Sequence, residues 1–223
     1  MNEALCDIHC HSRPVHFAET TVVCLSYQEI LTHQQFKHFS VGIHPWWISN
    51  INSLDLDVLK NHIKTLATSS GVSAIGETGL DRLYKETWDQ QLDLFHWHWA
   101  LAESRSLPLV IHKVRSGSDF LGLLKAKKPK TPWVFHDYHG SAEEVESLLK
   151  LHSECYFSFG DSLLKRESLQ ETVECIPLTR LLIETDEESQ LELPHYYEKM
   201  SQIRGFSSQE LQGQILTNFQ RLF

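Results

Sequence analysis

Two histidines separated by one residue, His9 and His11, end an apolar segment near the start of the chain. If this segment is a β-strand, alternate side chains face the same side, so Asp7, His9 and His11 point together. A lone histidine at such a place is commonly a buried structural residue, whereas two spaced in this way suit chelation of a divalent metal ion. The spacing therefore predicts that His9 and His11 are metal ligands.

Four more polar residues stand where apolar runs end. His112 and His136 each occupy the last position of such a run, Glu77 follows Val72–Gly76, and Asp186 follows a strongly apolar segment. Parallel strands of a barrel bring their carboxyl ends to one face, so these side chains should converge. The alternatives are buried structural histidines, a loop-capping role for Glu77 and a helix N-cap at Asp186.

The chemistry expected of this set is metal-assisted hydrolysis. A carboxylate such as Glu77 can bridge two cations, and Asp186 can orient or deprotonate the attacking water. Glu77 and Asp186 are accordingly the predicted catalytic residues. The predicted cofactors are two divalent ions (Mg, Mn or Zn), and the predicted ligands are His9, His11, Glu77, His112, His136 and Asp186.

The elements that must position these residues alternate between strands and helices. Eight strands are predicted, at Ala4–His9, Thr21–Leu25, Phe39–Ile43, Val72–Gly76, Pro108–His112, Trp133–His136, Cys155–Phe159 and Arg180–Glu184. Helical spacing or cap signals predict helices after a Ser53 cap, after Glu86–Asp89, at Asp119–Ala126, after a Ser141–Glu144 capping box, and at Leu163–Glu174, Tyr196–Arg204 and Ser208–Arg221.

This alternation predicts an α/β fold, a TIM (β/α)8 barrel formed by residues 1–223 as a single domain. Only roughly ten residues join the first two predicted strands, and a similar number join the next two, against the dozen or more that a crossover helix needs. The first βα units should therefore be trimmed.

Composition narrows the class of protein. No signal peptide or apolar run of membrane-spanning length is visible, which predicts a soluble, cytoplasmic protein without a membrane partner. The five cysteines form no CxxC pair and are interpreted as reduced core residues. A net charge of −9 disfavours a broad basic face for nucleic acid, so a phosphate-bearing substrate would depend on bound metals.

Several further residues are predicted to contact substrate. Arg115 could contact a phosphate, and Trp46, Trp47 or Tyr138 could stack on a base, although such aromatic residues are as often wall or core. His139 competes with His136 as a ligand but lies past the strand end, so it is assigned to the substrate. The predicted substrate-binding residues are Arg115, His139, Tyr138, Trp46 and His44.

The ordered motifs DIHCH, GIHP, GETGLD, LPLVIH, FHDYHG, YFSFG, PLTRLLIETD and NFQRLF resemble those of the TatD-like metal-dependent hydrolases, often described as TatD-family deoxyribonucleases. The resemblance covers essentially the whole chain. It implies a TIM barrel with a binuclear metal site, in which His9, His11 and Asp186 hold one ion, His112 and His136 hold the other, and Glu77 is shared. It also implies hydrolysis of phosphodiester bonds in DNA with magnesium or another divalent metal.

The chain departs from that family's pattern in the walls of the site. Trp46-Trp47 stand where the family usually has a second histidine after GIHP, Arg115 stands one place later than the family's arginine, Tyr138-His139 replace Phe-Ser, and Glu187-Glu188 follow Asp186 in place of a small residue and proline. The family's longer loop after Asp186 is reduced to a short acidic stretch.

The leading interpretation is a metal-dependent phosphodiesterase, a probable deoxyribonuclease, acting on single-stranded DNA or a small phosphoester without an obligate protein partner. The alternative is an amidohydrolase-like enzyme for a small lactone, amide or phosphoester, favoured by the acidic residues Glu187, Glu188 and Glu192, which would repel a polyanion. A non-enzymatic, metal-stabilised scaffold is the third interpretation, and retention of all six ligand positions argues against it.

Overall fold

Eight parallel strands follow one another in chain order in the computed structural model, which describes residues 5–14 and 16–223. They are β1 (Asp7–Cys10), β2 (Thr21–Cys24), β3 (Phe39–Val41), β4 (Val72–Asp81), β5 (Leu109–Val114), β6 (Trp133–Phe135), β7 (Cys155–Phe159) and β8 (Leu181–Ile183). Just beyond β8, Asp186 forms a parallel bridge with Cys10 and accepts a hydrogen bond from the His11 amide at 3.1 Å. The sheet thus closes at its carboxyl end, and the predicted TIM barrel is confirmed.

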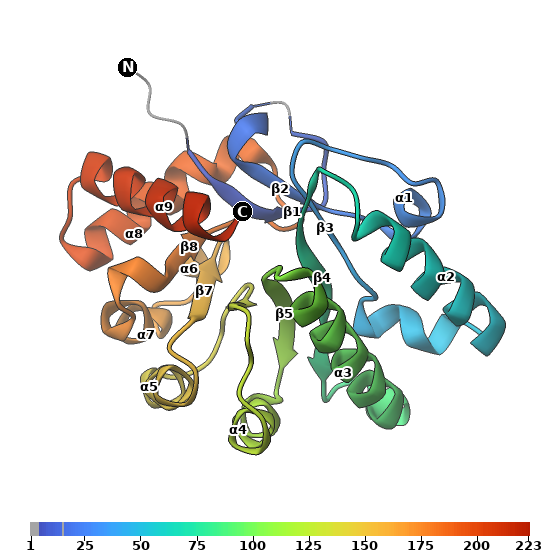
Figure 1. Ribbon diagram of the computed structural model, residues 1–223. Coiled ribbons are helices and arrows are strands. Elements are labelled where there is room, and N and C mark those ends of the chain that lie inside the picture. The colour runs from blue at the N-terminus through green and yellow to red at the C-terminus, as the bar shows by residue number, and fades with distance from the viewer. Residues whose placement is uncertain (1–4, 15) are drawn as a thin grey trace.

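Helices surround the strands (Figure 1). They are α1 (Tyr27–Leu31), α2 (Ser53–Leu66), α3 (Trp88–Arg105), α4 (Gly117–Ala126), α5 (Ala142–Leu151), α6 (Ser162–Lys165), α7 (Leu169–Cys175), α8 (Leu193–Arg204) and α9 (Ser208–Leu222). Among the described residues, none of these helices is both long and apolar enough to cross a bilayer.

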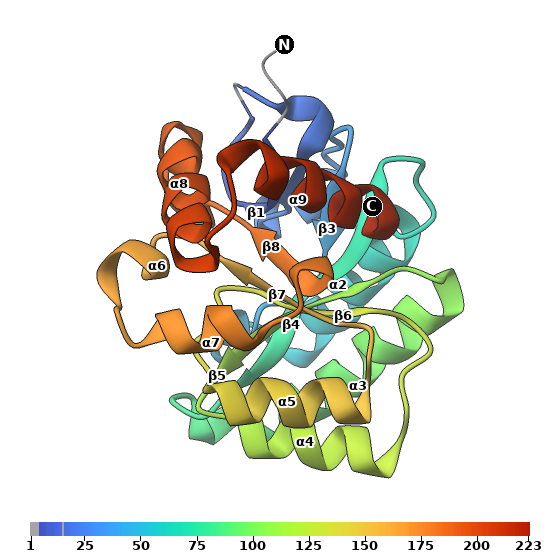
Figure 2. The ribbon, with the colours of Figure 1, turned by 90° about the vertical axis from the view of Figure 1, so that its left-hand side faces the viewer.

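Helix α9 lies over the amino ends of the strands (Figure 2). The Asn218 side chain donates to the carbonyls of Leu178 and Leu181 at the start of β8, and the Phe219 ring packs against His38 just before β3. The opposite end of the barrel, where the strands finish, is left for the functional side chains.

The first βα units are trimmed, as predicted. The described residues between β1 and β2 form only a short 3-10 turn, Ala18–Thr20, and α1 between β2 and β3 has five residues. Ala4, where the first strand was predicted to begin, lies outside the described residues.

Two predicted boundaries were wrong. Strand β4 continues through Asp81 and pairs with β5, so Glu77 lies inside the strand and not past its end. The helix predicted over Leu163–Glu174 is interrupted between α6 and α7. Leu163 and Leu169 are both buried, and one continuous helix would place them roughly 120° apart around its axis, so the interruption lets each leucine face the core directly.

Two predicted caps differ in detail. Helix α2 is capped by Asn52, whose side-chain oxygen accepts from the Asp55 amide at 3.0 Å, and Ser53 is its first helical residue. Ser141 caps α5 as predicted, but Glu144 does not complete the capping box. Its carboxylate instead accepts from Lys113 at 2.6 Å and from the Tyr138 hydroxyl at 2.8 Å.

Candidate active site

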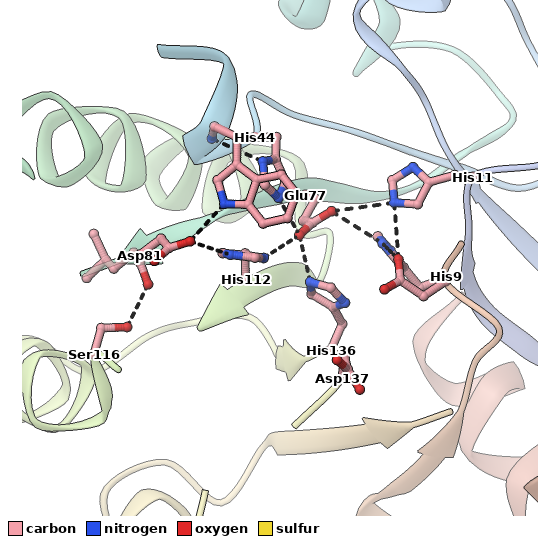
Figure 3. Close-up of polar contacts among 12 residues, drawn as sticks. His9, His11, His44, Glu77, Asp81, His112, Ser116, His136 and Asp137 are labelled. Atoms are coloured by element: carbon pink, nitrogen blue, oxygen red, sulfur yellow. Dashed lines mark hydrogen bonds and ion pairs between the residues drawn. The ribbon is translucent and has the colours of Figure 1, made fainter. Parts of the chain in front are cut away.

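Glu77 stands at the centre of a ring of imidazoles at the carboxyl end of the barrel (Figure 3). Its Oε1 lies 2.6 Å from His136 Nε2, 2.9 Å from His112 Nδ1 and 3.0 Å from His44 Nε2. Its Oε2 lies 3.3 Å from His9 Nε2 and 3.8 Å from His11 Nε2. One buried carboxylate therefore has an imidazole group on each side.

The course of β4 explains this central position. The pairing of β4 with β5 shifts register between Ile75 and Thr78, which places Glu77 at the irregularity. Gly76 has φ 140°, which a residue with a side chain rarely adopts, and a Cβ at Gly79 would lie 1.9 Å from the His112 carbonyl oxygen. The glycines on both sides of Glu77 thus permit the bend and the close approach of β5.

Barrel closure brings Asp186 to the same cluster. Its amide donates to the His9 carbonyl at 2.9 Å, and its Oδ1 lies 3.3 Å from His11 Nε2 and 3.7 Å from His9 Nε2. Asp186 has φ 54°, a left-handed conformation that aspartate tolerates better than most residues. The strand-end residues predicted as ligands are therefore all brought together.

Mutual electrostatics set the protonation of the cluster. Burial would raise the pKa of Glu77, but the neighbouring imidazoles, His136 and His44 foremost, hold it well below its ordinary value. Burial would lower the pKa of His136, yet the carboxylates of Glu77 and Glu184 hold it well above its ordinary value. For Asp186, burial acts upward, but its bond to His11 and nearby imidazoles bring the pKa below the usual value. Glu77 and Asp186 thus favour the ionised form, and His136 beside them favours the protonated form.

The residues fit a metal centre by one direct observation. His9 is fully buried, yet neither of its ring nitrogens has a hydrogen-bond partner among the described residues, because the carboxylates of Glu77 and Asp186 near Nε2 do not meet hydrogen-bond geometry. A buried polar nitrogen without a partner is costly, and a coordinated cation would satisfy it. Nitrogen and oxygen donors of this kind suit zinc, manganese or similar divalent ions.

The possible metal ligands form four clusters, and within each cluster the donor atoms lie within 4.8 Å of one another. One contains His9, His11, Cys24 and Glu77, a second His9, His136 and Asp186, a third His44, Glu77 and His112, and a fourth His11, Asp186 and Glu187. The clusters overlap, because His9, His11, Glu77 and Asp186 each belong to two of them.

Three residues in this centre were not assigned to it from the sequence. His44 was predicted to contact substrate, but it also reaches Glu77, and its place just after β3 matches those of the other strand-end histidines. Cys24 at the end of β2 lies within the first cluster, and burial raises the pKa of its thiol. Asp81 is buried, accepts from the Trp46 indole at 2.7 Å and lies 3.4 Å from His112 Nε2, so it fixes the orientation of His112.

A cavity of about 530 Å³ opens over the cluster. Its lining includes His44, Trp46 and His139, three of the five residues predicted to bind substrate, together with Trp47, which was considered for base stacking. Trp46 is 49% exposed beside Asp81, which leaves much of its ring open to the cavity.

Tyr138 and Arg115 do not occupy the positions predicted for them. Tyr138 is buried, its ring packs on Phe157, and its hydroxyl donates to Glu144, so it offers no stacking surface. Arg115 is exposed, has φ 53° and is not among the residues that line the cavity. Lys113, two residues earlier, lines the cavity instead and is paired with Glu144.

Metal affinity should increase with pH. The pKa values of His11, His112 and His136 are raised by Glu77 and other nearby carboxylates despite burial, whereas a metal binds the neutral imidazole. Each proton that the metal displaces should weaken binding roughly tenfold per pH unit below the pKa of that imidazole. Calorimetric Mn²⁺ titrations at about pH 6.5 and about pH 8.5, in two buffers, should show tighter binding at the higher pH and proton release at the lower. An affinity independent of pH would contradict ligation by these imidazoles.

Comparison with known proteins agrees with this geometry. The family model described as TatD related DNase matches residues 6–223. The uncharacterized metal-dependent hydrolase YcfH of Escherichia coli (strain K12) is 30% identical over 199 residues, covering 83% of this chain and 73% of YcfH. The 3'-5' ssDNA/RNA exonuclease TatD of Erwinia tasmaniensis is 30% identical over 214 residues, covering 86% of this chain and 80% of that protein.

A solved structure supports the fold. The crystal structure of YJJV, a TatD homolog from Escherichia coli, has a TM-score of 0.83 to this chain at 20% sequence identity, and the match covers 100% of this chain and 99% of YJJV. Together with the family match along nearly the whole sequence, this shows that the chain belongs to the TatD-related DNase family.

Proposed function

We propose that this chain hydrolyses phosphodiester bonds of single-stranded DNA with the aid of two divalent metal ions. The observation that carries the proposal is the ring of imidazoles around the buried Glu77, with a fully buried His9 whose ring nitrogens have no hydrogen-bond partner among the residues that the structure describes. The name of the Erwinia relative, a single-strand exonuclease, adds support for a single-stranded substrate.

Two half-sites share Glu77. His9, His11 and Asp186 would hold one ion, and His112 and His136 the other, with His44 close enough to the second half-site to take part. Bound there, divalent ions would neutralise the phosphate and lower the pKa of the attacking water. The acidic chain needs such cations to receive a phosphate.

Asp186 is the residue that handles the attacking water. Its carboxylate is ionised, lies at the cavity wall and is about one-third exposed, so water and substrate can both reach it. An ionised carboxylate at this place accepts a hydrogen bond from the water, orients it and takes up its proton as the oxygen attacks phosphorus.

A small phosphoester, lactone or amide is the second candidate substrate. Glu187 and Glu188 are exposed directly after Asp186, and Glu187 lines the cavity, so their charges oppose a polyanion at its rim. A small substrate would meet less of this repulsion than a nucleic acid chain.

A substrate panel separates the two candidates. Protein reconstituted with Mg²⁺, Mn²⁺ or Zn²⁺ would be incubated with single-stranded DNA, single-stranded RNA, a small phosphodiester, a lactone and an amide. Metal-dependent cleavage of DNA and of the small phosphodiester is the expected result. Turnover of the lactone or amide, with both phosphodiesters intact under every metal, would reject the proposal in favour of the second candidate.

Trp46 should contribute to DNA binding by stacking. Base stacking on an aromatic ring is worth about 1–3 kcal/mol, so Trp46→Ala should raise KM for single-stranded DNA by roughly fivefold to a hundredfold. The KM for a small phosphodiester should change little. Trp46→Phe is the matched control, because it keeps an aromatic face and loses only the bond to Asp81. If the two variants raise KM for DNA equally, the bond to Asp81 matters and stacking does not.

Charge reversal at the rim should improve DNA binding. In Glu187→Lys with Glu188→Lys, repulsion becomes attraction, so KM for single-stranded DNA should fall severalfold while KM for a neutral ester stays constant. Screening shortens from about 10 Å at 0.1 M salt to about 3 Å at 1 M, so moderate salt should harm the wild type less than the variant. Steady-state kinetics across a salt series measure both effects, and an unchanged KM would show that DNA does not pass this rim.

A further inference from the structure

A second, smaller cavity of about 240 Å³ adjoins the one that holds the metal cluster. Four residues line both cavities, namely Asp137, His139, Asp186 and Glu187. A substrate with its phosphate at the cluster and its next group in the smaller cavity would therefore pass directly beside His139. The smaller cavity also has Lys165 and Arg166 on its wall.

We propose that His139, paired with Asp137, donates the proton that the departing oxygen of the phosphodiester needs; this inference rests on the proposed function. His139 is the one residue of the shared four with a nitrogen-bound proton to give, since the others carry carboxylates, which accept hydrogen bonds when ionised. The nearby Tyr138 hydroxyl is buried and already donates to Glu144.

Asp137 holds the imidazole in place. Its Oδ1 lies 3.3 Å from His139 Nε2, and its own amide donates to Glu184 Oε1 at 2.6 Å, which anchors the turn after β6. Asp137 has φ 36°, so the turn is held in a conformation that few residues adopt freely. The ion pair engages Nε2, so the proton to be donated would be the one on Nδ1.

Exposure allows the proton to be used and replaced. The side chains of His139 and Asp137 are 31% and 33% exposed, so substrate and water can both reach the pair. After His139 has given up its proton, solvent can therefore supply another.

Two proton transfers accompany the exchange of bonds at phosphorus. The water oxygen forms a bond to phosphorus and gives its proton to Asp186, while the bond from phosphorus to the sugar oxygen breaks with its electron pair on that oxygen. His139 transfers its proton to the same oxygen, which leaves as an alcohol. The neutral imidazole then takes a proton from solvent, and Asp186 releases one.

Leaving-group dependence tests the assignment. A sugar alkoxide leaves poorly without a proton, whereas 4-nitrophenolate leaves readily without one. His139→Gln should therefore lower kcat for a dinucleotide about 10²-fold, the lower end for general acid catalysis, and lower kcat for bis(4-nitrophenyl) phosphate less than roughly threefold. Asp137→Asn should show the same pattern more weakly. Metal content and the melting temperature, measured for each variant, should match those of the wild type.

A sulfur substrate gives a second readout. When the departing bridging oxygen of the dinucleotide is replaced by sulfur, which leaves without protonation, the rate of His139→Gln should return to within roughly threefold of the wild type. Arg166→Gln is the control. Arg166 lines the smaller cavity but is not the proposed proton donor, so this substitution should affect the cleavage of both phosphodiesters alike.

Equal losses on both substrates in His139→Gln, or no loss on either, would overturn the proton-donor role. In that case wild-type cleavage of both phosphodiesters would leave the proposed function standing. Failure of the wild type to cleave either one with any divalent metal would instead remove the proposed function and this inference together.

Discussion

Asp186→Asn is expected to reduce kcat for single-stranded DNA by about 10³-fold. The amide cannot accept the proton of the attacking water, and general acid–base groups contribute about 10²–10⁴-fold on their own. The substitution also removes a negative charge that lies 3.3 Å from His11 Nε2, which weakens one metal half-site. Because asparagine keeps the size and the backbone preference of aspartate at φ 54°, the melting temperature should shift by only a few degrees.

The matched control for this variant is Asp57→Asn. Asp57 is exposed on α2 and lines neither cavity, so the loss of its charge should leave kcat nearly unchanged. His139→Ala should also cost less metal than Asp186→Asn, because the described contacts of His139 lead to Asp137 and not to the cluster. If His139→Ala loses the more metal, the choice of His136 as the ligand of that segment is wrong.

Glu77→Gln should produce a loss at least as large. Its carboxylate contacts imidazoles from both half-sites, and the amide that replaces it brings no charge to offset two cations. Metal stabilisation of transition-state charge is worth several kcal/mol, and each 1.36 kcal/mol is a factor of ten, so kcat should fall at least about 10³-fold. Bound metal should fall from about two ions per chain to one or fewer.

Glu77→Asp tests whether metal binding depends on the charge of this side chain or on its length. It keeps the negative charge with a shorter side chain and should retain more metal than Glu77→Gln, and equal metal in all three proteins would contradict the shared-ligand role.

The metal-free proteins offer a further check. The pKa of Glu77 is depressed in the native state, so its stabilising effect is present above its unfolded-state pKa and is lost as pH falls through the native value. The gap in unfolding free energy between wild type and Glu77→Gln should therefore narrow in acid.

Strand order and barrel topology could be predicted from the sequence because apolar runs alternate regularly with helical segments. The predicted positions of the eight strands agree with the observed ones to within a few residues, apart from the carboxyl end of β4. That end could not be predicted, because Gly76 and Gly79 normally signal a turn, whereas here they permit a bulge and close pairing with β5. The break between α6 and α7 likewise could not be predicted, because it depends on which leucines are buried in the core.

The convergence of strand-end histidines could also be predicted, since carboxyl ends of parallel strands share one face of a barrel. The direction in which each aromatic side chain points could not be predicted from the sequence. Tyr138 points into the packing between strands and α5, whereas Trp46 faces the cavity, and both look equally suited to stacking in sequence. The contact of His44 with Glu77 depends on the loop after β3, whose path no local pattern determines.

Cleavage of phosphodiester bonds by this chain should depend on bound metal, and a stepwise titration measures that dependence. Chelator-stripped protein would be reconstituted stepwise with Mn²⁺, and bound metal per chain and the rate of single-stranded DNA cleavage would be measured on the same samples. The expected result is no cleavage without metal, and a rate that rises with occupancy and reaches its plateau at about two ions per chain. No bound metal, or cleavage that is independent of the metal bound, would contradict metal-dependent hydrolysis at this site.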